Sequence, residues 1–309
     1  MTMIATPVCK LREQAKRLEA SLSVGVATPT VKAVHELRSA TRRVEAQLEL
    51  LGMMHGLPAY HPEAAKVLRR LESLRKRAGK VRDCDVHLKL LQDKDREMRS
   101  MPETTPDLIK SRDKLHKRLT KRRARKEQRL IAAIEKQLPK LARDTEALLK
   151  ALKPAEDRQA SVAEMLRLID HKFDRNLSSR QTGEEHLHDL RKAAKRARYQ
   201  CEGLPGPQAA ALARRLEDLQ DAGGSWHDLL DLAKSCHDTL GSDHPMSRLL
   251  EHLRDERLDD YLANLDDLRQ KRPHRRAAPA QKKAQQKSSS SAQHSTPRRT
   301  AKNSSRSRS

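Results

Sequence analysis

Hydrophobic residues recur along the chain at the three-to-four-residue spacing of amphipathic helices, and no sustained alternation typical of strands is present. Leu, Ala, Arg, Glu, Lys and Gln dominate the long segments, whereas Gly and Pro fall between them. Pro139 is the exception, because it lies inside a long segment and is expected to kink or divide it. The pattern predicts an all-α protein. The expected helices span about residues 7–22, 30–54, 62–79, 83–100, 107–151, 155–178, 184–203, 207–222, 225–240 and 245–270.

Two of these segments, 153 positions apart, carry nearly the same pattern of charge. The first reads Val-His-Glu-Leu-Arg over residues 34–38, and the second reads Leu-His-Asp-Leu-Arg over residues 187–191. Because an α-helix turns by about 100° per residue, the basic residues of each segment share one face and the apolar residues lie opposite. Each helix is therefore expected to have a packing side and a cationic side. The cationic side carries His35, Arg38 and Arg42 in the first copy and His188, Arg191, Lys192 and Lys195 in the second.

The duplication continues into the following segments. Arg-Arg-Leu-Glu at 69–72 recurs 145 positions later at 214–217, and a glycine and an aspartate follow in both copies. The glycine is expected to end one helix, because it adopts the left-handed conformation that closes helices. The aspartate is expected to begin the next helix as its N-cap. These positions are Gly79 and Asp83 in the first copy and Gly224 and Asp228 in the second.

The repeat divides the chain into two similar halves and a tail. Amphipathic helices joined by short loops bury their apolar stripes against one another, so each half is predicted to form a bundle of about four helices. The first bundle is expected over residues 1–150 and the second over residues 151–270. Residues 271–309 have almost no large apolar side chains, and we expect this basic tail to be disordered.

Net charge points to an anionic partner. The formal charge is +23, and the tail contributes 12 Lys and Arg without any Asp or Glu, which leaves +11 for the rest of the chain. A body this basic is typical of proteins that bind polyanions. With one Trp, three Tyr and one Phe, the chain lacks the aromatic platforms that stack on nucleic-acid bases. A polyanion without bases therefore fits the composition better than a single-stranded nucleic acid.

Catalytic and metal-binding patterns are weak. Asp83, Asp85 and His87 could share a metal site, but an N-cap and a helical surface explain them more simply. The sequence contains neither a glycine-rich phosphate loop nor a paired acidic cluster suited to magnesium. We therefore expect a protein that is not an enzyme and that needs no metal or cofactor.

Cysteine usage and hydropathy bear on location. The four cysteines are widely scattered, which favours reduced thiols in the cytosol. No apolar stretch approaches the ~20 residues of a membrane span, and basic residues interrupt the N-terminal segment before a signal peptide could form. The sequence predicts a soluble cytoplasmic protein without a membrane partner.

The two histidine strings, together with Gly-Lys-Val-Arg-Asp-Cys-Asp-Val at 79–86, closely resemble the signatures of the CHAD family, the conserved histidine α-helical domain. The resemblance covers roughly residues 8–270. It implies two pseudo-symmetric helical bundles that face each other across a basic central groove. It also implies binding of inorganic polyphosphate and association with polyphosphate granules, where other granule proteins would be possible partners.

Matching positions give the expected polyphosphate-binding residues. Glu45 departs from the family pattern, which commonly has a basic residue there, so the first repeat is expected to bind more weakly or asymmetrically. Tyr199 lies on the cationic side, where it could donate to phosphate or pack under arginine side chains. The expected ligand residues are His35, Arg38, Arg42, Arg43 and Arg82 in the first half and His188, Arg191, Lys192, Lys195, Arg196 and Arg198 in the second.

Other functions remain open at this stage. Basic residues on a helix are often just a solvated face, and each histidine could equally be a structural residue. The basic tail and high charge also suit a DNA-compacting or RNA-associated protein. A third possibility is an enzyme that hydrolyses or transfers phosphoryl groups. The sequence favours non-enzymatic polyphosphate binding over both alternatives, because the cationic pattern is duplicated.

Overall fold

The computed structural model describes residues 3–100, 105–179 and 181–270, with the backbone alone for residues 94–100. The predicted all-α fold is confirmed, and the predicted disordered tail lies outside the described residues. The first half contains α1 (Pro7–Ala27), α2 (Val31–Leu51), α3 (His61–Ser100) and α4 (Pro106–Leu152), followed by the short 3-10 helix η1 (Lys153–Ala155). The second half contains α5 (Val162–Leu177), α6 (Glu184–Glu202), α7 (Pro207–Leu240) and α8 (Pro245–Gln270). Two-residue strands, β1 (Ile4–Ala5) and β2 (Ala160–Ser161), pair antiparallel.

Two predicted helix breaks are wrong. α3 runs unbroken through Gly79 and Asp83, and α7 runs unbroken through Gly224 and Asp228. Neither glycine ends a helix, and neither aspartate is an N-cap. The physical reason is that an interior glycine costs a helix only about 1 kcal/mol, which burial of the flanking residues easily outweighs. In α3 those flanking residues include Ala78 and Val81, which are both fully buried.

Pro139 does not divide α4, which continues through it to Leu152. Proline removes one hydrogen bond from a helix, but apolar residues on both sides of this position are buried. The ends of several helices follow local chemistry instead. Thr30 caps α2 by accepting a hydrogen bond from the N–H of Ala33, and Ser161 caps α5 through the N–H of Glu164.

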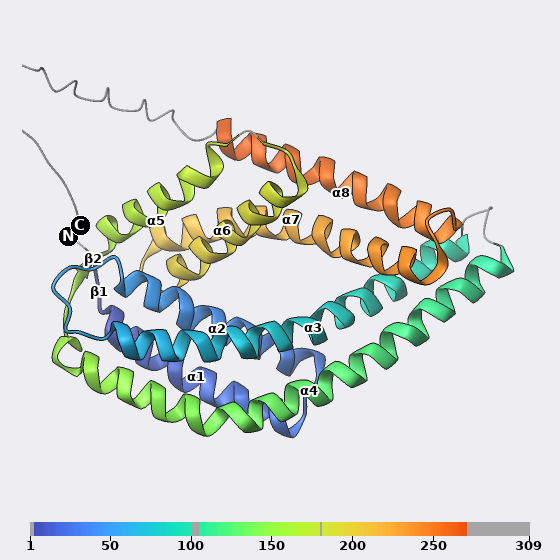
Figure 1. The fold of residues 1–309 in the computed structure, drawn as a ribbon. Coiled ribbons are helices and arrows are strands. Elements are labelled where there is room, and N and C mark those ends of the chain that lie inside the picture. The colour runs from blue at the N-terminus through green and yellow to red at the C-terminus, as the bar shows by residue number, and fades with distance from the viewer. Residues whose placement is uncertain (1–2, 101–104, 180, 271–309) are drawn as a thin grey trace, which may run out of the picture. The chain divides into compact units, whose positions relative to one another are not determined.

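Three hydrophobic clusters hold the described helices together. One packs α1 to α4, and a second packs α5 to α8 around Trp226 and Tyr261. The third joins residues of α3, α4, α7 and α8, including Leu91, Leu115 and Leu229. α3 and α4 run side by side, as do α7 and α8 (Figure 1). Each half therefore has its own core, while the third cluster links the two halves.

The arrangement of α2 and α6 positions the site. These two helices carry the duplicated histidine strings, and they contact each other directly. The described residues belong to one compact unit, and the predicted boundary between residues 150 and 151 stays a prediction. None of the helices in the described part of the chain combines the length and hydrophobicity that a membrane span requires.

Candidate anion-binding site

Cationic side chains from both halves converge where α2 meets α6. The pKa of Lys195 in α6 is lowered to about 7, first because burial disfavours its charge and then because Arg42 and Arg38 of α2 lie close by. The pKa of Arg42 is lowered to about 10, again by burial first and then by Arg38. Such shifts need several cations in a partly desolvated space. The structure therefore brings the duplicated basic residues together, as the sequence predicts.

α3 is the third helix that contributes a cation to this group. His35 of α2 is exposed, yet its pKa is lowered, first by desolvation and next by Arg82 of α3 and Lys195 of α6. Because charged residues of α3 and α6 both lower its pKa, His35 lies close to both of these helices. Arg191 of α6 corresponds to Arg38 in the repeat. We call these residues and Arg191 the central cationic cluster. It consists of His35, Arg38, Arg42, Arg82, Arg191 and Lys195.

The cations of the central cationic cluster form no ion pairs with carboxylates in the part of the chain that the structure describes. The Nε atoms of Arg42 and Arg191 are buried without a hydrogen-bond partner. Buried donors of this kind are normally satisfied, so a ligand that supplies acceptors would fit these two arginines. The cluster is therefore a candidate site for an anion.

Two aspartates lie near the cluster at matching positions of the repeat. Burial lowers the pKa of Arg38, and Asp83 gives the largest opposing influence; Asp228 plays that part for Arg191. Burial raises the pKa of Asp228 to about 6, with Asp83 adding to the rise. These carboxylates partly offset the positive charge of the cluster without forming ion pairs with it. Within the described residues, no group of three His, Cys, Asp or Glu side chains could hold a metal ion.

Arg43 and Arg196, which the sequence assigns to the ligand, join the two halves in the structure. Nε of Arg43 lies 3.2 Å from Oε2 of Glu202, and Nε of Arg196 lies 3.2 Å from Oε1 of Glu49. The repeat relates the two arginines to each other and the two glutamates to each other. We call these reciprocal ion pairs the α2–α6 seam. The sequence analysis missed these glutamates, although each glutamate stands six residues after the arginine of its own repeat copy.

Arg198 and Tyr199 belong to the same surroundings. Nη1 of Arg198 lies 2.5 Å from Oε1 of Glu217 and 3.5 Å from Oε1 of Glu202. The guanidinium carbons of Arg198 and Arg43 lie 4.6 and 5.4 Å from the centroid of the Tyr199 ring. Of the two roles expected for Tyr199, packing under arginine side chains is the one that the structure shows.

Lys192 is not a member of the central cationic cluster. Its ammonium lies 2.8 Å from Oδ1 of Asp189. With Lys172 and Arg196 it lines a separate cleft of about 220 Å³ between α5 and α6. Its sequence position, one residue after Arg191, turns it by about 100° from that arginine. Of the other predicted ligand residues, Arg196 lines the same cleft, and the charge of Lys192 adds to burial in lowering the pKa of His188.

The surroundings of the two site histidines differ. The ring of His188 stacks on that of His227, with centroids 4.5 Å apart, and burial lowers the pKa of His227 to about 3. Burial also lowers the pKa of His188, whose Nδ1 has no hydrogen-bond partner. The repeat relates His227 to Arg82, the neighbour of His35 in the first half. A neutral ring thus stands where the first half has a permanent charge.

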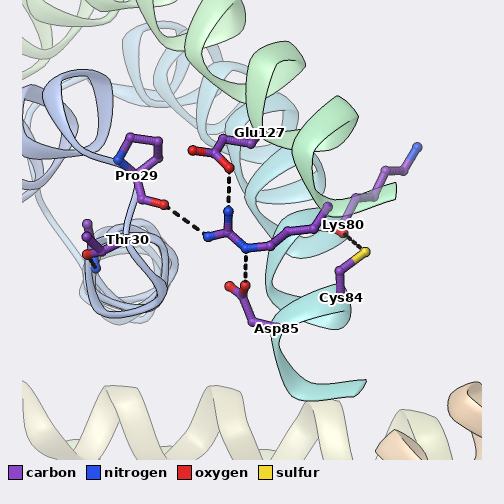
Figure 2. A network of polar contacts seen from close by, with 8 residues as sticks. Pro29, Thr30, Lys80, Cys84, Asp85 and Glu127 are labelled. Atoms are coloured by element: carbon purple, nitrogen blue, oxygen red, sulfur yellow. Dashed lines mark hydrogen bonds and ion pairs between the residues drawn. The ribbon is translucent and has the colours of Figure 1, made fainter. Parts of the chain in front are cut away.

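Glu45 does not leave a free negative charge beside the cluster, because it forms an ion pair with Arg75 of α3. Asp85 is likewise structural. Nε of Arg123 in α4 donates to Oδ1 of Asp85 at 2.5 Å, and the same guanidinium contacts Glu127 and the carbonyl of Pro29 (Figure 2). This network fastens α3 to α4 and to the turn before α2. Asp85 is thereby engaged with Arg123, and Asp83, Asp85 and His87 are not gathered as a metal-binding group among the described residues.

Comparison with known proteins identifies the family of the chain. The family model of the CHAD domain matches residues 10–236, and the chain belongs to the CHAD domain family. The resemblance seen in the sequence is thereby confirmed. A comparison with curated proteins found no match.

Two solved structures share the fold. PptA from Streptomyces chartreusis is 17% identical with a TM-score of 0.65, and the match covers 86% of this chain and 97% of that one. The CHAD domain from the plant Ricinus communis is 19% identical with a TM-score of 0.59, covering 86% and 92% of the two chains. At these identities the likeness shows the fold alone.

Proposed function

We propose that the protein binds inorganic polyphosphate at the central cationic cluster and leaves the polymer chemically unchanged. The observation that carries the proposal is the convergence of Arg38, Arg42 and Lys195 from both halves, without a carboxylate paired to any of them among the described side chains. Membership of the CHAD family supports this ligand, because the family is associated with polyphosphate binding.

The chemistry of the cluster suits a chain of phosphates. Arginine presents a planar fork of donors that matches phosphate oxygens, and lysine presents a compact charge. Tyr199 is buried beneath two arginines, so it offers no open face on which a base could stack. A bound polyanion would also raise the pKa of Lys195 from about 7 and so favour its charged form.

The direct test is a charge reversal in the full-length protein. Arg42→Glu with Lys195→Glu should weaken binding of long-chain polyphosphate by on the order of a hundredfold, because two charge-assisted contacts are lost. Arg69→Glu with Arg214→Glu is the matched control, since it makes the same change of net charge at two exposed positions. Isothermal titration at fixed salt measures both. Equal losses in the two variants would show that general charge, not the cluster, binds the polymer.

The competing functions have separate outcomes. If duplex DNA displaces polyphosphate at equal phosphate concentration, and deletion of residues 271–309 removes most affinity, the nucleic-acid function is correct. Shortening of polyphosphate during incubation with magnesium would instead show an enzyme. We expect neither result, because the proposed site lies outside the tail and contains no magnesium-binding group among the described residues.

The proposal extends to the cell. A protein that binds polyphosphate without consuming it is suited to associate with polyphosphate granules in the cytoplasm. A fluorescent fusion should form foci in cells that make polyphosphate and become diffuse in cells that do not. Loss of the foci in the Arg42→Glu, Lys195→Glu variant would assign them to the cluster.

A further inference from the structure

Gly79 of α3 lies directly against Arg38 of α2. A Cβ atom at Gly79 would lie well inside van der Waals contact distance of Nη1 of Arg38. The same Nη1 lies 3.5 Å from the carbonyl oxygen of Arg75, one helical turn earlier in α3. The end of the Arg38 side chain therefore occupies the space that a side chain at position 79 would need.

This contact explains why glycine stands inside a continuous helix. Glycine is an unfavourable residue at such a position, because its helix propensity is lower than that of alanine. A flexible arginine could move away from a methyl group, so the consequence of adding one is displacement of the guanidinium. We propose that Gly79 is a positioning residue, which keeps Arg38 against the backbone of α3 where it can contribute to the anion site. This inference rests on the proposed function for its effect on binding.

The second half supplies a matched control. The repeat relates Gly79 to Gly224 of α7, and a Cβ atom at Gly224 would meet nothing within 4 Å. Alanine at either position changes helix propensity by the same amount, so the two variants differ in what the new methyl group meets. The adjacent Gly223 is unsuitable as a control, because a Cβ there would lie 2.8 Å from the Tyr261 ring.

The binding experiment compares these variants by titration of long-chain polyphosphate into the full-length protein. Gly79→Ala should weaken binding by on the order of tenfold, which corresponds to one misplaced charge-assisted contact, whereas Gly224→Ala should leave it unchanged. Gly79→Ala should add no further loss to Arg38→Ala. An equal further loss in that background would overturn the inference, because Gly79 would then act through something other than Arg38.

A stability experiment makes the inference independent of the ligand. Gly224→Ala should raise the melting temperature by roughly 2–4 °C, because alanine favours the helix more than glycine does. Gly79→Ala should give no such gain in the wild type but should give it in the Arg38→Ala background. A gain of equal size in both backgrounds would contradict the inference.

Two remaining outcomes are also decisive. If Gly79→Ala does not fold, recovery of folding in the Arg38→Ala background supports the inference, and failure in both backgrounds overturns it. If the wild type does not bind polyphosphate, the proposed function fails, while the melting temperatures still report whether Gly79 makes room for Arg38.

Discussion

The two halves of the chain meet through matched contacts but surround their histidines differently. Along the α2–α6 seam, the ion pairs of Arg43 and Arg196 have the same length and use repeat-related partners. Away from the seam, the neighbour of His35 is Arg82, whereas His188 stacks on His227. The seam has kept the symmetry of the repeat, and so have the aspartates beside Arg38 and Arg191, whereas the neighbours of the two histidines have diverged.

The different surroundings of the two histidines are a second source of asymmetry between the halves of the site, besides the one expected at Glu45. The structure pairs that glutamate with Arg75. The larger difference lies between Arg82, which carries a permanent charge, and His227, whose pKa of about 3 keeps it neutral at physiological pH. Which half binds polyphosphate more strongly stays a prediction.

Among the changes that would sharpen the comparison of the two halves, pH is expected to have the largest effect on polyphosphate affinity. Between pH 8 and pH 6, Lys195 with its pKa of about 7 gains a proton, and Asp228 with its pKa of about 6 begins to lose its negative charge. Both changes make the site more positive, so polyphosphate affinity should rise by on the order of tenfold as pH falls through this range.

Titrations at pH 6, 7 and 8 and constant ionic strength measure this effect. Lys195→Arg provides the control, because arginine stays charged throughout and should flatten the dependence above pH 7. An affinity that falls on acidification would show that the cationic residues with shifted pKa values do not contact the polymer.

A smaller effect distinguishes the two aspartates. Asp228→Asn should tighten binding at pH 7 by about threefold, because it removes a poorly screened negative charge beside Arg191. Asp83→Asn should give a smaller change, since Asp83 is more exposed to solvent. At pH 5 the benefit of Asp228→Asn should disappear, because the wild-type carboxyl is then protonated. Tightening that persists unchanged at pH 5 would contradict the assigned cause.

The smallest effect concerns the seam. Arg196→Glu places two carboxylates together and should lower the melting temperature by about 2–4 °C, while the double variant Glu49→Arg, Arg196→Glu should recover most of the loss. The exchange of Arg43 and Glu202 should behave alike. Differential scanning calorimetry measures the melting temperatures. A double variant no more stable than the single one would show that the ion pairs of the seam do not stabilise the protein.

The sequence predicts the helices and the shared cationic face well, because both depend on local periodicity. It fails at Gly79 and Gly224, where a pattern typical of a helix end occurs inside a helix. At Gly79 the cause lies in a tertiary contact, since the space beside it holds Arg38 from another helix, whereas nothing in the structure explains the glycine at position 224. The seam is missed for the same reason, because its ion pairs join residues 147 to 159 positions apart.

The most direct test of the account is a crystal structure of the full-length protein with a short polyphosphate. The account predicts phosphate oxygens within hydrogen-bonding distance of Arg38 and Arg42 from α2 and of Arg191 and Lys195 from α6, with the ion pairs of the seam intact. Phosphate held instead at the cleft between α5 and α6, with the central cationic cluster empty, would contradict it.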